Sequence, residues 1–220
     1  MYAGFPPITT RQFCYKKIPI EVANDVNQEL IRARNMFGTI GIIETIRSDQ
    51  RVVARGAFAS YNPEERALLL RPKLGRMAAT AYFLNAPEGW FSTTSPFHGY
   101  QHEIGHALLY YCESILPFKE RLNLTCELDA YRERMFIYSD EGFNSLSEYA
   151  AKNYKEMVAE AIAQIMDGSA GSVAEQILLI LRGVGMYYNE ALVKLLRMKT
   201  DWVRVNDILL RILPDGAFTP

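Results

Sequence analysis

The chain has 220 residues, of which 49% are hydrophobic and 22% are charged, and its formal net charge is −1. This composition is typical of one globular domain with a sizeable core. The near-zero net charge gives no overall attraction to nucleic acid or to an anionic membrane surface. We therefore expect a single domain over residues 1–220 and no nucleic-acid partner.

The sequence also disfavours a protein with a signal peptide and a protein that spans a membrane. The N-terminus lacks a basic start followed by an apolar run, and the longest apolar run, ILLILRGVGMYY, is short and contains Arg182. The cysteines Cys14, Cys112 and Cys126 follow neither metal-binding nor disulfide spacing. We expect free thiols in a reducing compartment and no membrane span. Export by a route that leaves no signal stays open, as does the oligomeric state.

The first half of the chain predicts one helix followed by a small sheet. The expected elements are an amphipathic helix over 21–37 that ends at Gly38, a strand over 40–47 and a hairpin formed by 51–61 and 66–72. β-branched residues favour the strand, and Asn62-Pro63 supplies the turn of the hairpin.

The second half predicts mostly helices. The expected boundaries are a start after His98 and a stop before Pro117 for one helix, a start at Asn153 and an end at Gly168 for the next, and two or three helices over 172–213. Residues 118–148 show no clear pattern. One helix, a small sheet and then mostly helix indicate the α+β class, with a helical subregion over about 170–220.

The segment FHGYQHEIGHALLYY, residues 97–111, contains all three histidines of the chain and the pattern H-E-x-x-H. On a helix, His102 and His106 lie on one face, so both imidazoles can reach one zinc ion about 2 Å away. Glu103 lies beside them in the position of a general base that takes a proton from zinc-activated water. The pattern predicts a catalytic zinc site; the alternative is a helix that carries this pattern by chance.

The third ligand of such an ion has to come from outside this segment. His98 shares the face of His102, but it lies about 12 Å from His106 along a straight helix axis, which is too far for one ion. A place near the cleft or a contact with substrate stays open for His98. Cys112 lies about 9 Å beyond His106, and no histidine follows. The third ligand is therefore a downstream carboxylate, or the site is incomplete.

Among many downstream carboxylates, Glu156 and Glu160 stand out because they lie one turn apart on an otherwise apolar helix. Unpaired acids are costly to bury there. Glu156 could ligate the ion, and Glu160 could accept the outward N–H of a ligand histidine and fix its tautomer. Alternatively, Asn153 and Glu156 form a capping box, and Glu160 faces water. Spacing alone makes Glu156 the favourite among several candidates.

A second motif gives a resemblance to a known family. It is formed by Ser147, Tyr149, Asn153, Glu156 and Glu160. The motif resembles that of the metallopeptidases related to anthrax lethal factor and the Pro-Pro endopeptidases, which also occur in phage and mobile-element proteins. Gly105 within H-E-x-G-H belongs to the same resemblance. It implies a zincin-like (gluzincin) fold and one catalytic zinc held by His102, His106 and Glu156. It also implies that the hydroxyl of Tyr149 stabilises the oxyanion of the tetrahedral intermediate.

These observations predict a zinc-dependent endopeptidase with a protein or peptide substrate, located in the cytoplasm or in a phage particle. The strand near 66–72 could bind an extended peptide by strand addition. A second interpretation is a catalytically idle, zinc-stabilised structural domain, or a toxin- or phage-associated interaction domain. A third is a zinc hydrolase of a non-peptide amide; deformylase-type enzymes use an upstream cysteine ligand, and Cys14 in RQFCYKK does not fit that motif.

Overall fold

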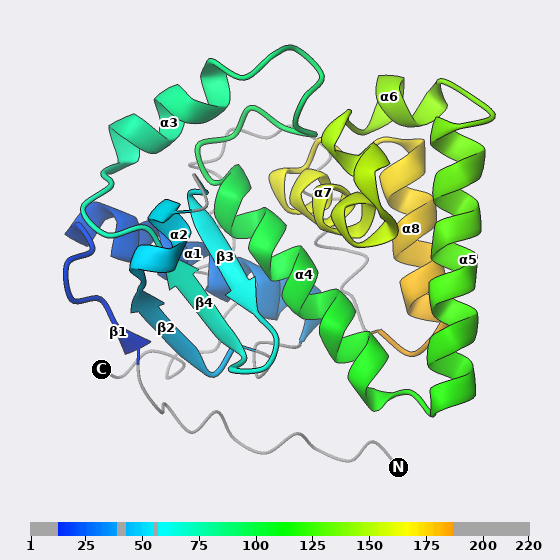
Figure 1. Ribbon diagram of the computed structural model, residues 1–220, viewed down its shortest axis with the longest axis horizontal. Coiled ribbons are helices and arrows are strands. Elements are labelled where there is room, and N and C mark those ends of the chain that lie inside the picture. Colours follow the sequence, from blue (N-terminus) through cyan, green and yellow to red (C-terminus); the bar gives the residue numbers. More distant parts are fainter. Residues whose placement is uncertain (1–12, 39–42, 55–56, 187–220) are drawn as a thin grey trace.

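A small sheet lies on one side of the long helix α4, and a group of helices lies on the other (Figure 1). The computed structural model describes residues 13–38, 43–54 and 57–186. In chain order, its elements are β1 (Phe13–Cys14), α1 (Ile20–Phe37), β2 (Thr45–Ser48), α2 (Gln50–Ala54), β3 (Ala59–Asn62), β4 (Ala67–Leu70), α3 (Arg76–Leu84), α4 (His98–Ile115), α5 (Phe118–Phe136), α6 (Glu141–Ser145), the 3-10 helix η2 (Tyr149–Lys152), α7 (Tyr154–Asp167) and α8 (Ser172–Gly183). This mixture of mostly helix with one small sheet confirms the expected α+β class in general terms.

The sheet has the strand order β1-β2-β4-β3. β1 and β4 both run parallel to β2, and β3 pairs antiparallel with β4, with Ser60 opposite Leu69. All four residues of β4 are buried, as expected for a strand with neighbours on both sides. The expected peptide-binding strand near 66–72 is therefore inside the sheet. Within the described residues, β3 forms one edge of the sheet and β1 the other, and β3 packs against α4.

Helix α7 begins and ends where its sequence predicts, and α1 begins one residue earlier than predicted and ends as predicted. α1 ends at Gly38, which adopts the left-handed conformation that favours glycine, with φ of 67°. α7 begins after Asn153, whose side-chain oxygen accepts hydrogen bonds from the N–H groups of Lys155 and Glu156. α7 ends at Gly168, with φ of 80°. Local capping chemistry thus sets both ends of the helix that carries the two candidate carboxylates.

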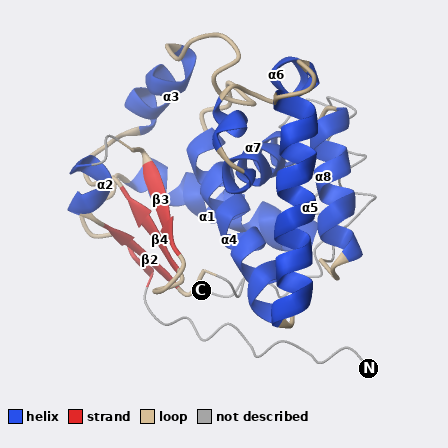
Figure 2. Cartoon of the chain, turned by 45° about the vertical axis from the view of Figure 1, so that its right-hand side comes forward, coloured by secondary structure: helices blue, strands red, loops and turns tan. Residues whose placement is uncertain are grey.

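Helix α7 packs directly on α4, and α5 and α8 contact α7 as well (Figure 2). Nearly the whole of α7 is buried, from Met157 to Met166. Gly105 of α4 allows the close approach of the two helices, because a Cβ atom there would lie 2.7 Å from the Cα atom of Ala159. The two helices that carry the candidate site are therefore held together by the core of the molecule.

Some expected elements differ from the structure. Residues 51–54, expected as strand, belong to helix α2, because the side chain of Asp49 accepts the N–H of Arg51 at 2.8 Å and caps a helical turn. The hairpin itself is confirmed over β3 and β4. α4 begins at His98 rather than after it. The expected helical segments beyond residue 186 lie outside the described residues. Among the described helices, none combines the length and the apolar composition needed to cross a membrane.

Candidate metal centre

Three side chains from two helices meet between α4 and α7. His102 and His106 come from α4, and Glu156 comes from the first turn of α7. The Nε2 atom of His102 lies 3.1 Å from Nε2 of His106 and 3.1 Å from Oε2 of Glu156. The Nε2 atom of His106 lies 3.3 Å from the same carboxylate oxygen. These three side chains could together hold a metal ion.

The spacing of the three atoms fits a tetrahedral ion. Ligand atoms that lie roughly 2.0–2.1 Å from a tetrahedral zinc ion are about 3.3 Å from one another. The observed separations are between 3.1 and 3.3 Å. Two of the three side chains are also partly open, since 22% of the His106 side chain and 21% of the Glu156 side chain are exposed. A bound ion would therefore be within reach of water and of a substrate.

Helix geometry explains why the three side chains converge. The two histidines are four residues apart and lie on one face of α4. The side chain of Asn153 binds the backbone N–H of Glu156 at 3.0 Å, which fixes the first turn of α7. The carboxylate of Glu156 turns toward the two histidines. Asn153 thus supplies its half of the capping box, while the carboxylate of Glu156 contacts the two histidines.

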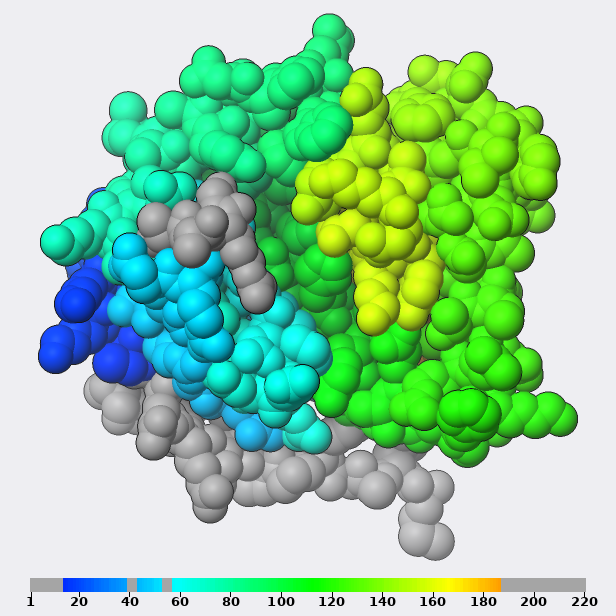
Figure 3. Space-filling model, viewed as in Figure 1, coloured from blue at the N-terminus to red at the C-terminus, as the bar shows by residue number. Residues whose placement is uncertain are grey.

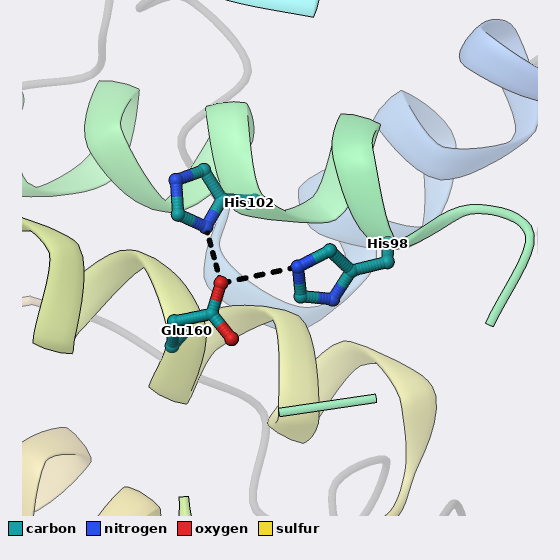
Figure 4. Close-up of side chains that lie close together, drawn as sticks. All are labelled: His98, His102 and Glu160. Carbon is teal, nitrogen blue, oxygen red and sulfur yellow. Dashed lines mark hydrogen bonds and ion pairs between the residues drawn. The ribbon is translucent and has the colours of Figure 1, made fainter. Parts of the chain in front are cut away.

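Glu160 lies one turn further along α7, where it is completely buried. Its Oε1 atom lies 2.8 Å from Nδ1 of His102 and 3.1 Å from Nε2 of His98 (Figure 4). Its Oε2 atom accepts the backbone N–H of Ser92 at 2.6 Å. The alternative in which Glu160 faces water is therefore wrong. Glu160 instead contacts the second ring nitrogen of His102, as the sequence suggested for a residue that fixes the tautomer of a ligand.

His98, His102 and Glu160 form a second group that could hold a metal ion. All three residues are buried, and the carboxylate oxygens of Glu160 already accept the hydrogen bonds of two imidazoles and a backbone N–H. An ion there would have no access to a substrate. The partly exposed group of His102, His106 and Glu156 is therefore the better candidate for a reactive metal centre, and Glu160 lies behind it.

His102 hydrogen-bonds to carboxylates on both of its nitrogens, and this changes its protonation. Burial disfavours the charged ring, but the hydrogen bonds to Glu156 and Glu160 outweigh it and raise the pKa of His102 to about 10. Burial likewise opposes ionisation of both carboxyl groups, yet the neighbouring histidines hold the pKa of Glu156 and of Glu160 well below the usual range. Both carboxylates are therefore ionised at neutral pH.

Glu103, the expected general base, lies next to the edge of the sheet. Its Oε2 atom accepts the backbone N–H of Tyr61 in β3 at 2.6 Å. The side chain is only partly buried, so it can contact water at the mouth of the site. This hydrogen bond links the candidate base on α4 to the strand that forms the edge of the sheet.

Tyr149 in η2 lies beside the candidate centre, with its ring centre 5.6 Å from that of His102. The ring also contacts Trp90 and Phe91, and the ammonium group of Lys152 lies 3.6 Å from its centre. Burial, with the nearby carboxylates, raises the pKa of Tyr149 to about 12. Its hydroxyl therefore stays protonated at neutral pH and can donate a hydrogen bond.

A groove lies beside the helices that carry the candidate centre. In the space-filling view, the groove runs between the β3–β4 hairpin and α7, and α4 forms its floor (Figure 3). The loop before α4 joins the wall on the α7 side, where the carbonyl groups of Gly89 and Trp90 accept the N–H groups of Glu148 and Tyr149 at 2.7 and 3.0 Å. These hydrogen bonds fix the segment that carries Tyr149 against the loop.

His98 differs from one of its sequence interpretations, whereas Cys112 is a free thiol as expected. His98 is 1% exposed, so it is no substrate contact. Burial raises the pKa of Cys112 to about 12, which keeps it a neutral thiol. The contact between His98 and Glu160 was not anticipated, although a signal for it exists. Histidines four residues apart on one helix match glutamates four residues apart on another, and such pairs can face each other when the helices pack.

Comparisons of the chain with protein-family models, with curated proteins and with solved structures found no match. A function for this chain therefore has to be inferred from the site itself.

Proposed function

We propose that the protein is a zinc-dependent endopeptidase. The observation that carries the proposal is the triangle of His102, His106 and Glu156, with ligand atoms 3.1–3.3 Å apart, beside the partly exposed carboxylate of Glu103. Two imidazoles and one carboxylate would hold zinc and leave a fourth position open, which is typical of catalytic rather than structural zinc. When bound, zinc would lower the pKa of water and polarise a carbonyl group.

Glu103 would act as the general base and then as the general acid. Its carboxylate would take a proton from the attacking water and pass it to the leaving amine. The hydrogen bond from the N–H of Tyr61 occupies one carboxylate oxygen and holds the side chain in place. The other oxygen would remain for proton transfer.

Tyr149 would stabilise the negative charge that develops on the carbonyl oxygen. The pKa of about 12 supports this role, because a protonated hydroxyl can donate a hydrogen bond to an oxyanion. The contacts of its ring with His102, Trp90 and Phe91 restrict the motion of the side chain, which favours a preorganised donor.

An extended peptide would bind along β3. This strand is the edge of the sheet next to α4, and its main-chain groups could pair with a peptide by strand addition. β3 therefore replaces the strand near 66–72 in this role. A peptide on β3 would run past Glu103 along the groove of Figure 3.

The same residues support a place among the zincin-like (gluzincin) metallopeptidases related to anthrax lethal factor and the Pro-Pro endopeptidases. The alternative is a catalytically idle domain that keeps zinc for stability. The partial exposure of His106 and Glu156 favours the enzyme, because structural zinc sites are usually closed by four protein ligands.

The test is cleavage of a peptide library by zinc-loaded wild-type protein and by the Glu103→Gln variant. The variant keeps all three proposed ligands, so we expect zinc affinity near that of the wild type and cleavage lower by about 10²–10⁴-fold, the usual contribution of a general base. Zinc content is measured on the same samples. Equal cleavage by both proteins, or a wild type that binds zinc and cleaves nothing, would contradict the peptidase proposal.

A further inference from the structure

A buried histidine outside the proposed ligand set contacts the carboxylate that supports the site. The Nε2 atom of His98 lies 3.1 Å from Oε1 of Glu160, and the Nδ1 atom of His102 lies 2.8 Å from the same oxygen (Figure 4). His98 is 1% exposed and Glu160 is fully buried. One oxygen atom thus receives hydrogen bonds from two imidazole rings, and only one of these rings belongs to the proposed metal centre.

The ring of His98 has further contacts besides Glu160. Its Nδ1 atom lies 3.3 Å from the hydroxyl of Thr93, which accepts the backbone N–H of Ser95 at 3.2 Å. The rings of Phe83 and Phe91 lie against its faces and edges, with ring centres 5.1 and 4.9 Å away. These contacts fix the orientation of the imidazole, so that Nε2 points at Glu160.

The direction of the hydrogen bonds determines the tautomer of His102. An ionised carboxylate can only accept, so Nε2 of His98 and Nδ1 of His102 both carry the hydrogen atom that they share with Glu160. In the neutral form of His102, the lone pair is then on Nε2, the atom that faces His106 and Glu156. The position of Glu160 therefore decides which nitrogen of His102 is free to bind a metal ion.

Within the described part of the chain, three donors hold the carboxylate of Glu160 in that position. Besides the two histidines, its carboxylate accepts the N–H of Ser92 on the other oxygen. Without His98, a fully buried anion would lose one of these three donors, and a buried carboxylate with missing partners is destabilised and free to rotate. The hydrogen bond to Nδ1 of His102 would weaken as a result.

We propose that His98 is a positioning residue of the metal centre: it anchors Glu160 by a hydrogen bond, and Glu160 in turn keeps Nε2 of His102 available as a ligand. This inference rests on the proposed zinc site of His102, His106 and Glu156. His98 itself binds neither metal nor substrate. Its effect is transmitted through Glu160 to His102.

The test compares zinc affinity, measured by competition with a chelator, between the wild type and two variants that are folded by circular dichroism. His98→Phe keeps a ring among Phe83 and Phe91 but removes the donor. His98→Gln keeps an N–H donor at about the reach of Nε2. We expect zinc affinity to fall by about 10-fold or more for His98→Phe, the lower end of the range for outer partners of a ligand. His98→Gln should stay within about 3-fold of the wild type.

Each outcome bears on a different part of the account. If the wild type binds zinc tightly and the His98→Phe variant binds it equally tightly, the role of His98 is overturned and the zinc site stays intact. A His98→Gln variant as weak as His98→Phe would overturn the hydrogen-bond explanation. A wild type that binds no zinc would overturn the proposed function and this inference together. If His98→Phe does not fold, His98→Asn replaces it, because its amide is too short to reach Glu160; equal affinity of the Asn and Gln variants would then overturn the role.

Discussion

His102 connects the exposed and buried halves of the candidate centre. Its Nε2 atom lies against Glu156 at 3.1 Å, and its Nδ1 atom lies against the buried Glu160 at 2.8 Å. Two carboxylates on one imidazole favour its charged form, so the pKa of His102 rises to about 10. A metal ion would replace the proton on Nε2, so metal binding at His102 would release one proton.

This exchange predicts a strong pH dependence of zinc binding. Because the pKa of His102 is about 10, this residue is protonated in the metal-free protein at lower pH. Each zinc ion then has to displace one proton. Zinc affinity should therefore rise about tenfold per pH unit from about pH 7.5 to 9, where an ordinary histidine is already neutral. Chelator competition, corrected for the pH dependence of the chelator, measures the slope. An affinity that does not change over this range would contradict the raised pKa.

Glu156 is the proposed ligand that the sequence identified least securely. Glu156→Gln removes the negative charge and the Oε2 ligand but keeps the size of the side chain. We expect a loss of zinc affinity of more than about 100-fold, beyond the range typical of outer partners. Glu127→Gln is the matched control, because it makes the same change of charge at an exposed position on α5. Zinc bound as tightly by the Glu156 variant as by the control would exclude Glu156 as the third ligand.

At the scale of elements, the close contact of α4 and α7 sets the geometry of the site. Gly105 lies between His102 and His106, and on α7 its neighbours are Ala159 and Ile162. A Cβ atom at Gly105 would lie 3.0 Å from the carbonyl oxygen of Ala159 and 3.1 Å from Cβ of Ile162. The absence of a side chain at this one position lets the histidines of α4 come within reach of the carboxylates of α7.

Gly105→Ala should therefore disturb both stability and metal binding. The extra methyl group has to push the helices apart, which we expect to lower the free energy of unfolding by about 1–3 kcal/mol and to weaken zinc binding. Chemical denaturation and chelator competition measure the two effects. Gly183→Ala in α8 is the control, because a Cβ atom there meets nothing within 4 Å. Equal stability and zinc affinity in the two variants would contradict the role of this close approach.

The sequence predicts an element well where local chemistry determines it. The wide apolar face and Gly38 specify α1, and Asn153 and Gly168 specify α7. α5 was not predicted, because its only apolar signal is a narrow stripe in a polar segment; the buried residues are Leu124, Leu128, Tyr131, Met135 and Phe136. The valines of α2 favour a strand, whereas the capping by Asp49 favours the helical turn that the structure has.

In the candidate site, too, the sequence predicts what local spacing determines and misses what the packing of helices determines. His102, Glu103 and His106 follow from spacing within a single helix. The sequence could only favour Glu156 over other carboxylates as the third ligand. Its approach to the histidines, 50 residues away in the sequence, depends on how α4 and α7 pack. The contact of His98 with Glu160 depends on the same packing. Spacing along one helix excluded His98 from the ion but gave no information about α7.

At the scale of the whole molecule, α4 lies between the sheet and the group of helices α5, α7 and α8 (Figure 1). Its sheet side brings Glu103 to the edge strand β3 through Tyr61. Its helical side brings His102 to Glu156 and Glu160. The proposed base and the two histidine ligands thus come from α4, while α7 supplies the carboxylate ligand Glu156 and the sheet supplies a strand for peptide binding. This arrangement explains how a small sheet and a helical half could form one active site.

A crystal structure of the zinc-loaded protein, with anomalous diffraction measured at the zinc absorption edge, tests the central claim most directly. The account predicts one anomalous peak roughly 2.0–2.2 Å from Nε2 of His102, Nε2 of His106 and a carboxylate oxygen of Glu156, with Glu160 still bound to Nδ1 of His102. A peak between His98 and Glu160 instead, or no peak at His102, His106 and Glu156, would contradict it.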